Sequence, residues 1–203
     1  HVDKELAEAV AKGLGLSPLP APAQAARPVV AGLEPSPALS ILENGPGSFT
    51  GRKLGIVITN GVDHELLGAL QDAVAAVNGT VELIAPTVGG LKDSAGNPLV
   101  AQQRINGGPS VLYDAVALLP TVEGANALRH EATMRDFIAD AFAHAKFIAH
   151  NDAAELLLAA AGLHPKMRDE GVIALESASD ADTFIQTCGA LRLWAREGRV
   201  HSI

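Results

Sequence analysis

Hydrophobic residues alternate between two patterns from residue 51 onward. Short runs of aliphatic and β-branched residues, typical of buried parallel strands, occur at 53–59, 80–85, 115–119, 147–149 and 172–175. Between them, apolar residues recur at helical spacing over 63–77, 131–145, 152–161 and 179–197. Strands that alternate with helices in this way predict a parallel sheet with helices on both faces.

Local signals refine this pattern. Asn60 and Asp63 are both available to cap the helix over 63–77, and Ser179 and Asp182 have a capping-box-like spacing at the start of the last helix. The turn residues 93–97 lie between the apolar segments 88–91 and 99–102, which predicts a hairpin. The fold class expected from residues 51–203 is therefore an α/β, three-layer, flavodoxin-like sandwich with a mostly parallel sheet.

Residues 1–50 have a different character. Residues 3–13 predict a short helix with Asp3 as N-cap, Gly13 just after its end, and Leu6 and Val10 on one face. Residues 17–50 hold seven of the twelve prolines, which favours an extended path and excludes a compact domain. We therefore expect two parts, a helix with a Pro-rich linker over 1–50 and a folded domain over 51–203.

Composition limits the classes of function. The apolar fraction of 48% is that of a globular protein, and 15 Lys and Arg against 23 Asp and Glu give a net charge of −8. This acidic balance argues against a nucleic-acid partner, and the absence of an apolar run of ~18 residues argues against a membrane span. Cys188 is the single cysteine and is expected in the core. Because the sequence starts at His1, we expect it to be a piece of a longer product.

The turns at the carboxyl ends of the strands are where ligands bind in an open parallel sheet. Four such turns are expected, at 60–63, 86–87, 120–126 and 150–152. The first carries Thr59, Asp63 and Glu65, whose carboxylates would repel a phosphate and instead suit the helix dipole. The sequence contains no glycine-rich nucleotide motif.

The turn after residues 147–149 is the most suggestive, because a strand that runs directly into a helix can expose a nucleophile. His150, Asn151 and Asp152 occupy it, with neither Cys nor Ser. Two interpretations stay open: a structural histidine with a capping Asn/Asp pair, or a vestigial or small-ligand site.

The remaining candidates are weaker. Ser110 lacks the context of a nucleophile elbow, and the pairs Asp140/His144 and His130/Glu131 lack a third metal ligand at a defined spacing. We therefore expect no catalytic, cofactor-binding or metal-binding residue in this chain.

Several segments resemble one family, the large-subunit haem catalases, in the C-terminal extension of those proteins. The segments are HVDKELA (1–7) with GLGL (13–16), SPALSI (36–41) with GRKLGI (51–56), GPSVLYDAV (108–116) and AKFIAH (145–150). The first pair resembles the last helix of the catalase body entering its linker. The extension is in turn similar to class I glutamine-amidotransferase-like and PfpI-type proteins. Those proteins use an elbow Cys, where His150 stands at or next to the equivalent position here, and a carboxylate near Glu65.

The resemblance implies an accessory role. A parent catalase would decompose hydrogen peroxide to water and oxygen at a haem whose axial Tyr, distal His and Asn lie in the catalase body. Tyr113, the only tyrosine here, has no such motif around it. Implied partners are the catalase body, the sister subunits of a homotetramer and unfolded client proteins, in the cytoplasm. The alternatives are a PfpI-type hydrolase or glyoxalase, and a small-molecule-binding module, which would include a flavin-binding one.

Overall fold

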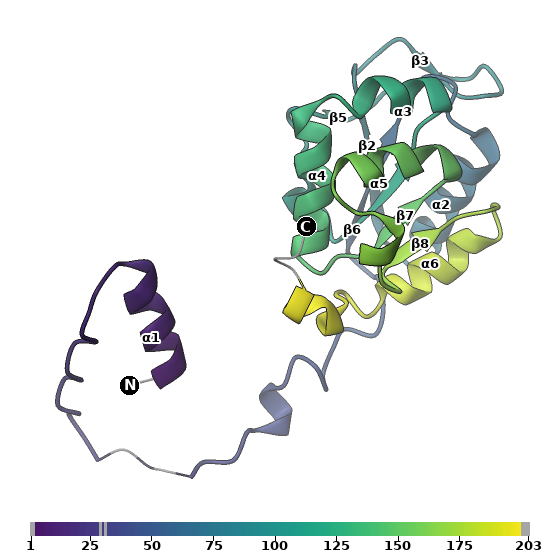
Figure 1. Cartoon of the computed structure of the whole chain (residues 1–203). Coiled ribbons are helices and arrows are strands. Elements are labelled where there is room, and N and C mark those ends of the chain that lie inside the picture. The colour runs from purple at the N-terminus through teal and green to yellow at the C-terminus, as the bar shows by residue number, and fades with distance from the viewer. Residues whose placement is uncertain (1–2, 29, 31, 200–203) are drawn as a thin grey trace. The chain divides into compact units, whose positions relative to one another are not determined.

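The structure is a computed structural model of the chain and describes residues 3–28, 30 and 32–199 (Figure 1). Residues 1–2 and 200–203, which belong to the two predicted parts, lie outside the described residues. The chain divides into two compact units, His1–Ser40 and Ile41–Ile203. No helix in the described ranges is both long and apolar enough to cross a membrane.

The first unit contains helix α1 (Lys4–Gly13). The Asp3 carboxylate caps it by accepting from the Leu6 amide at 2.8 Å, as its sequence predicts. The helix continues one residue further than expected, because Gly15 rather than Gly13 takes the left-handed conformation, with φ +69°. Leu6 and Val10 are 56% and 52% exposed, so the apolar stripe of α1 is not covered within its own unit.

The second unit contains the remaining elements. Its strands are β1 (Lys53–Ile58), β2 (Thr80–Ala85), β3 (Leu91–Lys92), β4 (Pro98–Leu99), β5 (Gln103–Arg104), β6 (Ala115–Leu119), β7 (Ile148–His150) and β8 (Val172–Ala174). Its α-helices are α2 (His64–Ala76), α3 (Val122–Leu128), α4 (Ala132–Ala143), α5 (Glu155–Ala160) and α6 (Asp180–Cys188). Single 3-10 turns at Pro37–Leu39 (in the first unit), Ser110–Leu112, Asp152–Ala154 and Pro165–Met167, and a longer one at Trp194–Arg199, complete the set.

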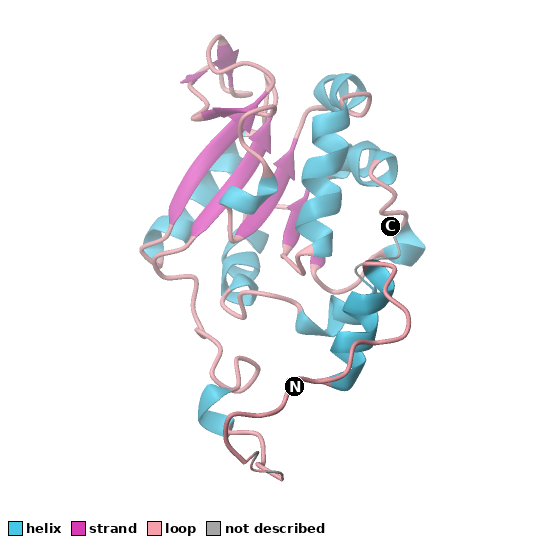
Figure 2. Cartoon of the chain, turned by 90° about the vertical axis from the view of Figure 1, so that its left-hand side faces the viewer, coloured by secondary structure: helices cyan, strands magenta, loops and turns pink. Residues whose placement is uncertain are grey.

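Six strands form one sheet in the order β5-β2-β1-β6-β7-β8, and every pair in it is parallel. β3 and β4 form the separate antiparallel hairpin that the turn residues predict. Figure 2 shows helices on both sides of the sheet. The predicted three-layer α/β fold with a mostly parallel sheet is confirmed.

The alternation of side chains along β1 produces two separate cores. Leu54, Ile56 and Ile58 point into a core that includes the buried faces of α2 and α6. Val57 points into the second core, with the apolar faces of α3, α4 and α5. Because both faces of the strand are covered, its sequence is a continuous apolar run.

Gly55 is required by a close approach of Tyr113. A Cβ atom on Gly55 would lie 2.6 Å from two carbons of the Tyr113 ring. The ring is buried, and its hydroxyl donates to the Glu82 carboxylate at 3.2 Å. Burial, followed by the charge of Glu82, raises the pKa of Tyr113 well above its usual value.

The C-terminal segment differs from its prediction. The helix expected over 179–197 ends at Cys188, and a 3-10 turn follows at Trp194–Arg199. A Cβ at Gly189 would meet the backbone of Gly47 and Ser48 at 3.2 Å, so the chain packs closely where the helix stops. The predicted capping box is also wrong, because Asp180 rather than Ser179 accepts from the backbone amides of the first turn.

Arg196 holds this segment on the domain. Its side chain is buried, with 1% of the residue exposed, and it pairs with Asp169 through two hydrogen bonds of 2.8 and 2.7 Å. The guanidinium also lies 4.2 Å from the centre of the Phe142 ring and donates to the Lys146 carbonyl at 2.7 Å. Gly171 makes room for it, since a Cβ there would lie 2.4 Å from Nη2.

Two further elements were not predicted. α3 forms within 120–126, which was interpreted as a turn, because the Thr121 hydroxyl caps it by accepting from the Gly124 amide at 3.1 Å. β5 is only two residues long, too short for a periodicity to appear. The strand predicted at 147–149 lies one residue later, at Ile148–His150.

Gly55→Ala is expected to lower the free energy of unfolding by about 1–3 kcal/mol, because the new methyl group overlaps the Tyr113 ring. Gly68→Ala is the control: its Cβ meets nothing within 4 Å in α2, so it should stabilise by about 0.4–1 kcal/mol. Urea unfolding of both variants measures the difference. Equal effects of the two substitutions would show that the Tyr113 contact is unimportant.

Candidate functional site

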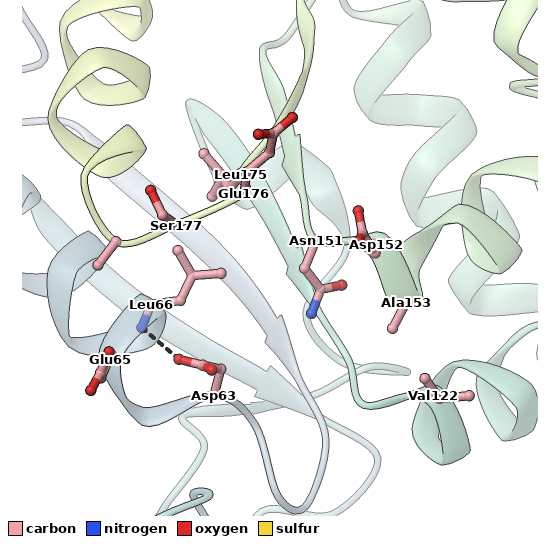
Figure 3. A pocket seen from close by; sticks show the side chains of 11 residues that line it. Asp63, Glu65, Leu66, Val122, Asn151, Asp152, Ala153, Leu175, Glu176 and Ser177 are labelled. Atoms are coloured by element: carbon pink, nitrogen blue, oxygen red, sulfur yellow. Dashed lines mark hydrogen bonds between the residues drawn. The ribbon is translucent and has the colours of Figure 1, made fainter.

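A cavity of about 710 Å³ lies at the carboxyl edge of the sheet (Figure 3). It is bordered by the start of α2, the start of α3, the turn after β7 and the loop after β8. Two of these borders, at 60–63 and 150–152, are turns that the sequence predicts as ligand-binding positions. The lining residues are Asp63, Glu65, Leu66, Val122, Asn151, Asp152, Ala153, Leu175, Glu176, Ser177 and Ala178.

The charge of the cavity is entirely negative. Asp63, Glu65, Asp152 and Glu176 contribute carboxylates to its lining, and the lining includes no Lys, Arg or His. The buried side chains of Leu66 and Leu175 are the apolar part of the lining. Such a cavity disfavours phosphate and other anions, as expected for the first turn.

At the start of α2, Asp63 is the residue that caps the helix. Its Oδ1 accepts from the Leu66 amide at 2.8 Å. The alternative cap, Asn60, instead accepts from the Lys92 amide of the hairpin at 2.9 Å. Glu65, the residue nearest to the carboxylate position of PfpI-type proteins, lines the cavity but is exposed. Both acidic residues stand at a helix N-terminus, where they complement the helix dipole.

The elbow after β7 holds Asn151, not His150, in the cavity. The Asn151 amide group donates to the Pro120 carbonyl at 2.9 Å, and its oxygen accepts from the Ala154 amide at 3.1 Å. Its backbone is relaxed, with φ −88° and ψ 173°. A side-chain amide that caps a helix in this way offers no attacking atom.

His150 belongs to β7 and lies on the opposite face of the sheet from the preceding Ala149. It is 4% exposed, with Nδ1 3.2 Å from the Asn151 carbonyl and 3.8 Å from the Glu155 carboxylate. Glu155 is itself held by Arg168 through bonds of 2.6 and 2.8 Å. Burial lowers the pKa of His150 despite the nearby carboxylate. The structural interpretation of this histidine is the one that the contacts favour.

The other candidates are scattered. Ser110 is buried outside the cavity, and the Arg129 side chain donates to the His130 ring at 3.2 Å. The ring nitrogen Nδ1 of His144 lies 2.7 Å from the Asp140 backbone carbonyl. Within the described residues, no three His, Cys, Asp or Glu side chains gather as a metal site would require.

Cys188 is buried on the apolar face of α6, as predicted. Burial raises the pKa of its thiol well above the usual range. The cysteine is also absent from the cavity lining. It therefore has the character of a core residue rather than a nucleophile.

Sequence reasoning missed the loop after β8, which provides Leu175, Glu176 and Ser177 to the cavity. The rule that directed attention to the other turns applies to this strand end as well. The Ser177 hydroxyl is hydrogen-bonded to the Ser179 hydroxyl at 2.7 Å and to the Asp180 carboxylate at 3.3 Å. The lining brings no histidine or lysine to this hydroxyl as a general base.

The sequence matches the family described as the C-terminal domain found in long catalases over residues 50–197. Among its relatives are Catalase C of Rhizobium meliloti (strain 1021), 49% identical over 98% of this chain, and Catalase HPII of Pseudomonas putida, 31% identical over all of it. The chain spans about a quarter of the length of these relatives, 28% in both cases.

Solved structures with the same fold include oxidized DJ-1 from Toxoplasma gondii, with a TM-score of 0.57 and 16% identity over 74% of this chain and 96% of the other. A mutant DJ-1 superfamily protein from Salmonella typhimurium has a TM-score of 0.57 and 20% identity, over 74% and 95% of the two chains. These likenesses concern the fold.

Acidification is expected to destabilise the domain through His150. Its pKa in the folded state lies below the unfolded value near 6.5, so the unfolded state binds the proton first. The stabilisation is therefore present above about pH 6.5 and is lost as the pH falls towards the folded pKa. His150→Gln should flatten the dependence of unfolding free energy on pH between 7 and 5. The exposed His130→Gln is the control and should leave the slope unchanged; an unchanged slope in His150→Gln would contradict the assignment.

Cys188 should not react with a thiol reagent such as DTNB in the native chain and should react fully after unfolding, because it is buried and its thiol stays protonated. Asn151→Cys is the matched comparison, since it introduces a thiol into the cavity lining. That variant should label with one equivalent in the native state. Rapid native labelling of the unmodified chain would contradict the placement of Cys188.

Proposed function

The chain belongs to the family of C-terminal domains found in long catalases, and from this premise we propose that it is an accessory, non-catalytic domain of such a catalase. The haem chemistry that decomposes hydrogen peroxide would belong to the catalase body. The domain would stabilise the assembled subunits and extend the path by which peroxide reaches the haem. The observation that carries the proposal is the elbow, where Asn151 occupies the cavity and caps a helix.

The alternative of a PfpI-type hydrolase or glyoxalase has less support. It needs a nucleophile with a base in reach, whereas His150 and Cys188 are both buried away from the cavity. A phosphate-bearing ligand such as a flavin nucleotide is disfavoured by the four carboxylates of the lining.

Haem does not fit the described part of this chain. The phenol of Tyr113 is buried against Gly55 and donates to Glu82, so it is not available as an axial ligand. The cavity carboxylates would repel the haem propionates. We therefore derive no step through a haem in this domain.

We further propose that residues 1–50 connect this domain to the catalase body and that the folded domain covers 51–203. The family match, which begins at residue 50, supports that boundary. The exposed Leu6 and Val10 of α1 support docking of this helix on the body, because a helix of this length is marginal without a packed face. The partners would be the body and the sister subunits of a cytoplasmic homotetramer.

Three proteins test the proposal: a full-length long catalase that contains this chain, the same protein cut after residue 50, and the chain alone. The chain alone should show no Soret band and no oxygen evolution from peroxide. The shortened catalase should retain turnover per haem but lose activity at a lower temperature, by several degrees, and dissociate more readily on size-exclusion chromatography. Peroxide turnover by the chain alone, or identical thermal inactivation with and without residues 51–203, would contradict the accessory role.

A further inference from the structure

Two guanidinium groups meet a single carboxylate at the edge of the sheet opposite the cavity. Arg52 Nη1 is 3.3 Å from Asp114 Oδ1, and Arg192 Nη1 donates to the Asp114 backbone carbonyl at 3.0 Å. The second oxygen of Asp114 accepts from the Lys53 amide at 2.9 Å. The one carboxylate is therefore already used by the backbone and by Arg52, and no charged group is paired with Arg192 by a printed contact.

Positive charge exceeds negative charge around this position. Lys146 is buried with its ammonium on the Ser110 and Tyr113 carbonyls at 2.5 and 2.7 Å, and it interacts with the charges of Arg192 and Asp114. Burial, and then the charge of Arg192, lowers its pKa to about 8. The other neighbouring lysine, Lys53, is neutralised by Glu82. Asp114 therefore faces two arginines and one partly protonated lysine, with Asp140 as the only other carboxylate acting on that lysine.

Donors are left over in this cluster. The Arg52 Nε atom is buried and has no hydrogen-bond partner among the described residues. A buried donor without an acceptor costs free energy, and an orphaned donor beside excess positive charge calls for an anionic acceptor. The Arg52 side chain is nevertheless 26% exposed and Arg192 is half-buried, so a small group from solvent can reach both.

Both arginines also stand where the two ends of the domain meet. Arg52 follows the linker and donates its amide to the Phe49 carbonyl at 3.1 Å, while Arg192 follows the tight packing of Gly189 on Ser48. Burial, and then the charge of Arg52 opposed by that of Asp114, lowers the pKa of Arg192, which agrees with two like charges held close together.

We propose that Arg52 and Arg192 form an oxyanion-binding site whose ligand is a phosphate or carboxylate group. Planar guanidinium groups suit this ligand, because each presents parallel N–H donors to two oxygens. The site is separate from the acidic cavity, which lies at the carboxyl ends of the strands. A free phosphate and a carboxylate side chain from the rest of a long catalase share this chemistry, and the test separates them.

The test titrates the 203-residue chain with inorganic phosphate and with acetate, by calorimetry and by thermal unfolding at constant ionic strength set with chloride. A ligand at ten times its Kd should raise Tm by about 3 °C. Arg192→Gln and Arg52→Gln should each lose the calorimetric signal and most of this shift. Having both variants keeps the test decisive if one of them does not fold. Arg104→Gln is the matched control, since it removes the same charge from an exposed position on β5 and should keep the full shift.

The outcomes are distinct. Binding in the unmodified chain and in Arg104→Gln, with loss in the two cluster variants, supports the site. Absence of binding in the unmodified chain, or an equal shift in all four proteins, overturns it. The full-length catalase then identifies the source: binding retained there indicates a free oxyanion, whereas binding lost there, with Arg192→Gln lowering the stability of the assembly, indicates a protein carboxylate.

Discussion

The burial of β1 on both faces is the constraint on which the rest of this domain depends. A strand whose alternate side chains point into two cores must have parallel neighbours and a helical layer on each side. Once six parallel strands are arranged this way, all their carboxyl ends lie at one edge and all their amino ends at the other. The acidic cavity and the arginine cluster are separated for that reason, and each takes its residues from segments distant in sequence.

The parts of the fold that could be predicted from sequence are those in which local and long-range forces agree. β2 and β6 have the predicted bounds, because an uninterrupted apolar run between turn residues has no other stable position than the middle of a sheet. α3 could not be predicted in the same way. Its first residues carry turn signals, and its cap Thr121 is positioned by Thr59, 62 residues earlier in the chain, at 3.1 Å. Tertiary contact of this kind leaves no local pattern.

The candidate site shows a sharper limit. The elbow was located correctly, but a shift of β7 by one residue exchanges the faces of the sheet, so His150 is buried beside α5 and Asn151 takes the cavity position. Strand ends are the least certain feature of a sequence-based prediction, and here one residue decides which side chain meets a ligand. The family resemblance was confirmed because it depended on the order of several segments and not on any single boundary.

The buried arginine of the C-terminal segment has an evolutionary consequence. Its guanidinium occupies the volume in which any side chain at position 171 would have to lie, so these two positions share one space. A drift away from glycine at 171 is tolerable only after a smaller residue has replaced Arg196, and that replacement would strand the buried Asp169 carboxylate. Related sequences should therefore change these three positions together, and they offer a signature of this arrangement that can be sought in an alignment.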